Sequence, residues 1–405
     1  MPRLLILYHY FYPDDVVSAH HFAQLAEELQ ARGWQVMAMP CNRGCRDESK
    51  KFKAVENWNG IEIRRIWRPR FRESSSVGRI LNVIWMLFAW SIVALRKKNV
   101  PNIDVVVVGT DPILSVLVAL AWKMSRPRTR VVQWCFDLHE MVLAERFLRP
   151  RFIFVNALKA LLKPAYGACD LIVDIGKCMK TKLQEYSKST AKITLTPWAL
   201  AEPAGPLPID VAERESVFGN SKLAILYSGN FGRAHSYDMF LELARHLRGE
   251  GIEFAFSIRG NRADEVKKAV SSSDNNVAFV PFAPIEQLQA RLSSADIHLV
   301  SLRDEWCGYV VPSKFFGSLA VGRPIIFAGD KSSALARWIE TYKVGWVLTE
   351  ETAPFVAERL KQLSQSREQL KSLWQRCHQV YQNSFSKKEI ADQWNYELCK
   401  LLEKA

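Results

Sequence analysis

The sequence predicts an α/β protein with two doubly wound domains, each built around a parallel sheet. Short apolar runs of strand length alternate with segments long enough for crossover helices, which is the pattern of parallel α/β folds. The alternation restarts after a proline-rich stretch near the middle of the chain, and this break indicates a domain boundary. A length of 405 residues also suits two domains, each with its own core.

The first series of elements extends from the N-terminus to residue 198. A strand over residues 4–8 leads through a loop into an amphipathic helix, and a strand over residues 35–39 follows. Further strands are predicted at residues 61–66, 105–108, 131–134, 171–175 and 193–195. We therefore assign residues 1–198 to an N-terminal domain.

The second series follows three prolines between residues 203 and 208, which can continue neither a helix nor a central strand. Strands are predicted at residues 223–227, 254–258, 277–280, 297–300 and 324–327, with helices at residues 237–247, 265–271, 285–292 and 313–321. We assign residues 199–384 to a C-terminal domain. Residues 385–405 form a separate segment that contains a last helix, residues 387–402.

Charge and cysteine content narrow the classes of partner and compartment. The net charge of +13 favours an anionic partner, which includes phosphate-bearing ligands, acidic membranes and nucleic acid. The eight cysteines form no C-x-x-C pair and no zinc spacing, so we predict reduced thiols and no metal site. The apolar run at the N-terminus is too short for a signal peptide, and we expect a cytoplasmic protein.

An apolar segment, residues 80–95, has two readings. It contains sixteen residues without a charge, fewer than the roughly 20 needed to span a bilayer. A basic and aromatic run, residues 64–72, precedes it and suits an anionic membrane surface, whereas a buried crossover helix beside a solvated edge strand explains both segments equally well. In the membrane reading the contact is made by Ile80, Val83, Ile84, Leu87 and Trp90 and by Arg64, Arg65, Arg68, Arg70 and Arg72.

Two strand-to-helix junctions of the second domain suit a diphosphate. The first contains Gly229, Asn230, Gly232 and Arg233, where glycines let backbone amides approach an anion; Arg259 ends the next strand. The second has Ser313 and Lys314 in the first turn of a helix, where a lysine opposes the helix dipole unless an anion is bound. Each residue also has a simpler interpretation: Ser313 could be an ordinary N-cap of the helix, and Lys314 could be a solvated side chain.

The order of these segments resembles the retaining glycosyltransferases of family 4. The resemblance rests on Tyr-Ser-Gly-Asn-Phe-Gly at 227–232, Ala-Asp-Ile at 295–297, Val-Pro-Ser-Lys at 311–314 and Ala-Val-Gly-Arg-Pro-Ile at 320–325. In the first domain, Tyr-Pro at 12–13, residues 25–36 and Asn-Gly-Ile at 59–61 agree with it. The resemblance covers nearly the whole chain. In particular, the chain resembles the branch of the family that builds bacterial surface polysaccharides on undecaprenyl-linked acceptors.

The resemblance implies a GT-B fold, with two Rossmann-like domains and a C-terminal helix that crosses back to the first. It implies transfer from a nucleotide sugar bound by the second domain, UDP before GDP, to a lipid-linked or other glycan acceptor on the first. The basic run at residues 64–72 and the apolar segment at residues 80–95 add the expectation of a peripheral location at the inner face of the cell membrane. No metal or other cofactor is expected, because Arg233 and Lys314 would neutralise the leaving diphosphate.

The chain departs from the family pattern at one carboxylate. Gly317 stands where family members have a glutamate that holds the ribose, and Tyr309, which the strict pattern separates from that position by seven residues, is not acidic either. The stretch from Glu305 to Gly308 matches the Glu-x-x-Gly with which the family motif opens. We therefore predict Glu305, with Asp304 beside it, as the carboxylate that faces the donor sugar.

A further candidate lies in the first domain, after the strand at residues 131–134. Asp137 and Leu138 match an Asp-Leu segment of the family, and Asp137 could hydrogen-bond or deprotonate an acceptor hydroxyl. His139 and Glu140 are neighbouring alternatives, and a helix N-cap is the competing reading of Asp137. Two other functions stay open: a sugar-nucleotide epimerase or silent subunit of the same fold, favoured by Gly317, and nucleic-acid binding, which the absence of any recognised binding motif disfavours.

Overall fold

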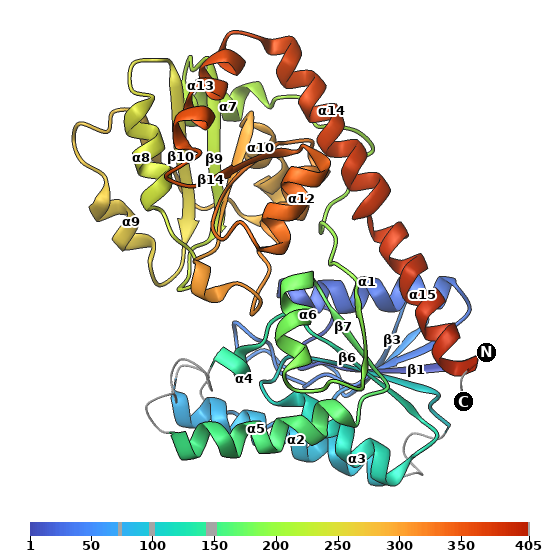
Figure 1. Ribbon diagram of the computed structural model, residues 1–405. Coiled ribbons are helices and arrows are strands. Elements are labelled where there is room, and N and C mark those ends of the chain that lie inside the picture. Colours follow the sequence, from blue (N-terminus) through green and yellow to red (C-terminus); the bar gives the residue numbers. More distant parts are fainter. Residues whose placement is uncertain (72–74, 97–101, 143–151, 404–405) are drawn as a thin grey trace. The chain divides into compact units, whose positions relative to one another are not determined.

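A computed structural model describes residues 1–71, 75–96, 102–142 and 152–403 and divides into two compact units (Figure 1). The first unit consists of Met1–Thr196, Gly308–Val310 and Ile390–Ala405, and the second of Pro197–Cys307 and Val311–Glu389. Arg72, one residue of the predicted membrane surface, lies outside the described residues.

The first unit contains an eight-stranded sheet in the order β3-β4-β2-β1-β5-β6-β7-β8, which is parallel except for the β3–β4 pair. The strands are β1 Arg3–Leu7, β2 Gln35–Ala38, β3 Val55–Trp58, β4 Ile61–Arg64, β5 Val105–Gly109, β6 Arg130–Trp134, β7 Leu171–Asp174 and β8 Ala191–Thr194. The predicted doubly wound sheet is thus confirmed. Edge strand β3 was missed because it has no apolar run, although the turn after it, Asn59-Gly60, has the positive φ angles and the dipeptide that tight hairpins prefer.

The helices of the first unit cover the sheet in two groups (Figure 1). They are α1 Val17–Ala31, α2 Ser76–Leu95, α3 Val118–Ser125, α4 His139–Val142, α5 Phe152–Gly167, α6 Lys177–Gln184 and α15 Lys387–Glu403, with the short η1 Ser115–Leu117. Helices α2, α3 and α5 pack together beneath one face. The C-terminal helix α15 packs on the unit as expected: Trp394 lies edge-on to Trp134 at 5.0 Å, and Arg32 pairs with Asp392 at 2.7 Å.

The second unit contains a fully parallel six-stranded sheet in the order β11-β10-β9-β12-β13-β14. The strands are β9 Leu223–Asn230, β10 Ile252–Arg259, β11 Val277–Phe279, β12 Ile297–Ser301, β13 Ile325–Ala328 and β14 Gly345–Leu348. Strand β9 extends three residues beyond the predicted end, because Ser228 to Asn230 continue to pair with β10 up to Arg259. Gly229 and Asn230 therefore belong to the strand and not to the turn.

Helices on both faces complete the second unit. They are α7 Val211–Phe218, α8 Asp238–His246, α9 Ala263–Ala269, α10 Leu288–Ser293, α11 Lys314–Ala320, α12 Ala334–Tyr342, α13 Ala353–Ser364 and α14 Arg367–Ser384, with η3 Ile285–Gln287 and η4 Asp304–Trp306. The predicted helix at residues 285–292 is in fact η3 followed by α10. Strand β14 and helices α7, α12, α13 and α14 were not predicted from the sequence.

A buried carboxylate organises the amino end of the second sheet. Asp296, fully buried just before β12, pairs with Arg214 at 2.8 Å and with Arg367 at 2.6 Å, and accepts a hydrogen bond from the Ala224 amide. Arg323, also fully buried, donates to four backbone carbonyls and stacks on the Trp374 ring at 4.2 Å. The family-like stretches at 295–297 and 320–325 therefore have a structural role, because Asp296 and Arg323 connect helices and loops at this end of the second sheet.

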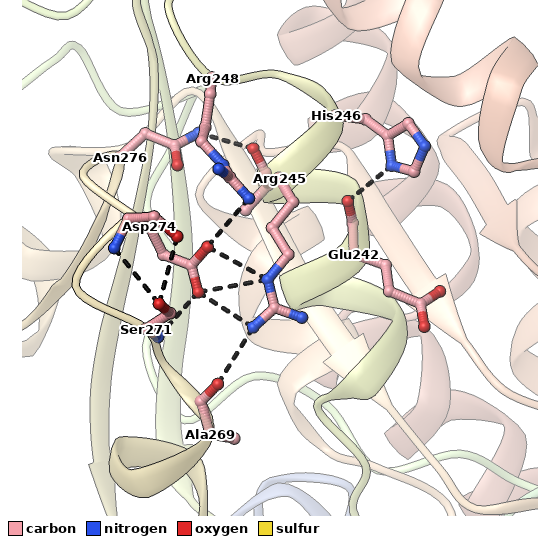
Figure 2. Close-up of polar contacts among 10 residues, drawn as sticks. Glu242, Arg245, His246, Arg248, Ala269, Ser271, Asp274 and Asn276 are labelled. Atoms are coloured by element: carbon pink, nitrogen blue, oxygen red, sulfur yellow. Dashed lines mark hydrogen bonds and ion pairs between the residues drawn. The ribbon is translucent and has the colours of Figure 1, made fainter.

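A second acidic centre ties α8 to the chain before β11 (Figure 2). The buried Asp274 carboxylate bonds Arg245 at 3.0 Å and Arg248 at 3.3 Å, and it accepts from the Ser271 amide. The hydrogen bond from Arg245 lowers the pKa of Asp274 below its usual value. These arginines stabilise a loop, so their charge is not available for a ligand.

Helix α2 corrects part of the predicted membrane surface. It is twenty residues long, and among the described helices it is the one long and apolar enough to cross a membrane, a test that core helices of soluble proteins also pass. Trp90 is fully buried and donates to the Met39 carbonyl, so it cannot face lipid. Arg65 and Arg68 are buried as well, and Arg65 pairs with Glu56 at 2.6 Å.

Candidate functional site

The carboxyl edge of the second sheet provides one candidate site. The chain proceeds from β9 to β10 and β11 on one side and places β12, β13 and β14 on the other, so the strand order reverses between β9 and β12. Open α/β sheets bind ligands at the carboxyl ends of their strands where the order reverses. The loop after β9 lies against this point, because the Arg303 amide donates to the Ala234 carbonyl at 2.8 Å.

Lys314 is held directly over the end of β9. Its Nζ donates to the Asn230 carbonyl at 3.0 Å and lies 5.1 Å from the centre of the Tyr227 ring. Gly229 makes this position accessible: it has a φ of +130°, and a Cβ there would come within 2.6 Å of the lysine Cε. Burial lowers the pKa of Lys314 to about 8. The ammonium is thus placed in a partly desolvated position in which an anion would stabilise its charge.

Other predicted donor-binding residues lie at the ends of the same strands, in the loop after β9 and at the start of α11. Arg259 is the register partner of Asn230 at the ends of β10 and β9, and its guanidinium lies 4.0 Å from the centre of the Phe282 ring. Gly232 follows close to the Asn230 side chain. Arg233 and Ser313 are exposed, and Ser313 makes no side-chain cap bond to α11, which argues against the plain N-cap.

His235 was not among the predicted donor-binding residues. Its Nδ1 lies 2.9 Å from the Ser301 carbonyl at the end of β12. Burial and the nearby Lys314 lower the pKa of His235 to about 3, so the ring is neutral, with Nδ1 donating to the carbonyl and Nε2 left as an acceptor. A lone histidine in a loop carries no sequence signal for this role, which depends on the meeting of two strand ends.

The acidic candidates, Asp304 and Glu305, lie on η4 after the end of β12. Glu305 is exposed on η4, 3.8 Å from the Arg303 guanidinium. Burial and the neighbouring Asp330 and Glu305 carboxylates raise the pKa of Asp304. A side chain at Gly317 would meet nothing within 4 Å outside its own helix, so packing does not exclude the carboxylate that the family has there.

The first unit has a corresponding reversal between β1 and β5. His9, buried after β1, lies with Nδ1 3.2 Å from the Asp111 carboxylate after β5. Burial favours the neutral imidazole, but Cys41 and Asp111 outweigh burial and raise the pKa of His9. The sequence indicates His9 and Asp111 only separately as residues that could reach this edge, and not as a pair, because they are 102 positions apart.

Asp137 follows β6 at the same edge. Its carboxylate lies 3.5 Å from Nε2 of the exposed His139. Burial raises the pKa of Asp137, His139 opposes this shift and Asp111 adds to it. A carboxylate with a raised pKa beside an imidazole is suited to exchanging a proton with a hydroxyl. Asp137 and His139 are thus together in the first unit, whereas Glu305 belongs to the second.

No group of three or more histidine, cysteine or acidic residues in the described ranges could hold a metal ion. Within those same ranges all eight cysteines are free thiols.

The depressed pKa of Lys314 predicts a pH dependence of nucleotide binding. Below pH 8 the lysine is charged with or without ligand, and affinity should be constant. Above pH 8 Lys314 is neutral in the free protein and must take up a proton before it can pair with the diphosphate. The affinity for UDP should therefore fall by up to about tenfold per pH unit. Isothermal titration of UDP at pH 7.0 and 9.5 tests this, and equal affinities at both would contradict it. Lys314→Arg, which stays charged, should flatten the profile.

Comparison with known proteins agrees with this architecture. No family model matches the chain. The chain is 25% identical over 288 residues to the probable glycosyltransferase WbjE of Pseudomonas aeruginosa, covering 69% of this chain and 70% of the relative.

Two solved structures show the same fold over nearly the full length. HepE of Anabaena, determined with UDP, has a TM-score of 0.64 at 12% identity, with 99% of this chain and all of that one covered. WaaG, a glycosyltransferase involved in lipopolysaccharide biosynthesis, has a TM-score of 0.64 at 14% identity, with 98% and 99% covered. The chain therefore has the GT-B fold, and its sequence is similar to glycosyltransferases over two thirds of its length.

Proposed function

We propose that this protein is a retaining glycosyltransferase that transfers a sugar from a nucleotide diphosphate donor to a glycan or lipid-linked acceptor in polysaccharide biosynthesis. The observation that best supports it is Lys314, held over Asn230 at the point where the second sheet reverses. The similarity to WbjE supports the enzyme class, and the four family-4-like stretches support retention. HepE binds UDP, and structures of it with UDP-glucose exist, which favours a UDP-sugar here, with a GDP-sugar second.

In this proposal the second unit binds the donor. Lys314, Arg259 and Arg233 neutralise the diphosphate, while amides of Gly229, Asn230 and Gly232 and the Ser313 hydroxyl approach its oxygens. Charge-assisted hydrogen bonds of this kind are about twice as strong as neutral ones. His235 and Glu305 face the sugar as acceptors. Because Gly317 supplies no carboxylate, we assign the neutral His235 Nε2 as the acceptor for a hydroxyl of the donor.

The first unit binds the acceptor. Asp137 accepts the proton of the attacking hydroxyl, and His139 at 3.5 Å stabilises the carboxylate. A thermal-shift screen with UDP, GDP, ADP and their sugars tests the donor. Product analysis on the best ligand then separates the candidates, because a transferase releases the nucleoside diphosphate whereas an epimerase converts one nucleotide sugar into another. Stabilisation by none of them would refute the proposal.

Metal independence is a separate expectation. Since cationic side chains are assigned to the diphosphate, turnover of the best donor should be unchanged in EDTA. Loss of turnover in the chelator, with recovery on adding Mg²⁺ or Mn²⁺, would contradict it. Measuring the nucleotide affinity in parallel shows whether any metal effect lies in binding or in the chemical step.

We further propose that α2 lies in the plane of an anionic membrane at the inner face of the cell membrane. One side of α2 is buried, and the other exposes Val77, Ile80, Ile84 and Phe88, each more than half exposed. Trp67, 60% exposed, packs edge-on against Trp85, and an aromatic pair of this kind suits the headgroup level. Among the described residues, Arg79 and Arg96 at the two ends of α2 and Arg70 before it are exposed cations, and they replace the buried Arg65 and Arg68 of the sequence-based prediction.

Vesicle co-sedimentation tests the membrane surface. Binding to vesicles with anionic lipid should exceed binding to neutral ones and should weaken with salt, because salt screens surface charge over roughly 10 Å at 0.1 M. Replacing Ile80, Ile84 and Phe88 by Ser should abolish it. Phe355→Ser is the matched control, since Phe355 is 66% exposed on α13 of the second unit. Equal binding to both vesicle types, or unchanged vesicle binding by the triple variant, would show that α2 has a structural role only and does not contact the membrane.

A further inference from the structure

Three residues of the chain between η4 and α11, Gly308–Val310, belong to the first unit. They run antiparallel to the segment after β6: Val310 forms a β-bridge with Asp137, and the Tyr309 carbonyl accepts a hydrogen bond from the Leu138 amide at 2.9 Å. This segment therefore contacts the backbone of Asp137 and of the residue after it, next to the carboxylate that the proposed function assigns to the acceptor hydroxyl.

The position of these contacts along the chain is informative. The last hydrogen bond to the sheet before Asp137 is donated by the Cys135 amide to the Val173 carbonyl of β7 at 2.8 Å. The bonds after them are those from the Met141 and Val142 amides to the Leu138 carbonyl at the start of α4. Asp137 thus lies between the end of β6 and the first turn of α4, where neither regular element holds its backbone directly. The Tyr309 bond supports the chain at that point.

Helix α6 holds the other side of the segment. Gly308 is buried with a φ of +84°, and a Cβ on it would lie 2.9 Å from the Cys178 carbonyl oxygen and 2.9 Å from Lys182 Cγ. Tyr309 is only 5% exposed, and Lys182 Nζ lies 4.9 Å from the centre of its ring. The segment is consequently wedged between α6 and the Asp137–Leu138 backbone, and a glycine is required where it comes closest to the helix.

We propose that Gly308–Val310 is a positioning segment for Asp137, which keeps the carboxylate at the carboxyl edge of the first sheet and restricts the access of water to it. This inference rests on the proposed function, because it needs Asp137 to act on the acceptor. The segment itself touches no reacting atom. The Glu-x-x-Gly pattern that ends in Gly308 is then explained in part by the close approach to α6.

Gly308→Ala tests the proposal on the full-length protein, with the best nucleotide sugar of the screen as substrate. The added methyl group should displace the segment from α6, and kcat should fall at least tenfold while the dissociation constant for UDP changes less than twofold. Gly167→Ala is the matched control, because Gly167 ends α5 of the same unit and a Cβ there meets nothing within 4 Å.

The pH–rate profile distinguishes positioning from a loss of folded protein. Burial raises the pKa of Asp137 against the effect of His139, with Asp111 adding to the rise. A displaced segment admits water, so the acid limb that Asp137→Asn removes should move to lower pH in Gly308→Ala. A smaller folded fraction would lower every rate without moving the limb. If Gly308→Ala does not fold, Tyr309→Leu, which keeps the backbone carbonyl, should show faster amide exchange at Leu138 and a lower kcat.

The outcomes separate the two proposals. Wild-type kcat in Asp137→Asn would overturn the role of Asp137 and the positioning segment together. Loss of kcat in Asp137→Asn with wild-type kcat and acid limb in Gly308→Ala would overturn the positioning segment alone. A parallel loss of UDP binding in Gly308→Ala would indicate general misfolding, and Tyr309→Leu then decides: wild-type kcat and wild-type amide exchange at Leu138 in that variant would overturn the positioning segment.

Discussion

Lys314→Ala is expected to weaken UDP binding by about 1.5–3 kcal/mol, a factor of roughly 10 to 150, which is the range for losing a charge-assisted hydrogen bond. The side chain brings its ammonium over the end of β9, where one proton is used by the Asn230 carbonyl at 3.0 Å and two remain for phosphate oxygens. Isothermal titration at pH 7.0 measures the change. Arg233→Ala should act in the same direction.

Two further variants show whether the position of the charge matters. Gly229→Ala leaves the lysine in the chain but places a methyl group within 2.6 Å of its Cε, so it should also weaken binding. Lys361→Ala is the control: Lys361 pairs with Glu250 at 2.8 Å near the amino end of β10, and its removal should leave UDP affinity unchanged. If Lys314→Ala bound UDP as tightly as the wild type, the assignment of the donor site to this edge of the sheet would be wrong.

Asp296→Ala should cost about 3–5 kcal/mol of the free energy of unfolding, the typical result of breaking a buried ion pair from one side. The variant leaves Arg214 and Arg367 without the carboxylate that both contact within 2.8 Å, and it removes the acceptor of the Ala224 amide. Since this network joins α7, α14 and the starts of β9 and β12, the loss should appear in the unfolding transition of the second unit. Urea denaturation followed by circular dichroism measures it.

Asp264→Ala is the matched control for this experiment. Asp264 is also an aspartate with a basic partner, Lys267 at 3.6 Å, but its side chain is 87% exposed. Exposed pairs contribute little, so the variant should lie within about 0.5 kcal/mol of the wild type. If Asp296→Ala were as mild as Asp264→Ala, the Asp296 network would not be the centre of the second unit's stability.

Much of the candidate donor site could be predicted from sequence because its residues follow strands. Asn230, Arg259 and Lys314 each stand at a strand-to-helix junction, and parallel strands bring such junctions to one edge. The pairing of His9 with Asp111 could not be predicted in this way. It depends on β1 and β5 being neighbours, and strand order is not contained in the local periodicity of either strand.

The sequence by itself determined the two doubly wound sheets and the last helix, which was predicted at residues 387–402 and is Lys387–Glu403. Apolar periodicity and proline positions are local properties, and they suffice for such elements. Only the tertiary structure decided which face of α2 is buried, because that helix is apolar on both sides and its neighbours select the face that contains Trp90. The same reason applies to Asp296 and to Gly308–Val310, whose roles arise from partners distant in the chain.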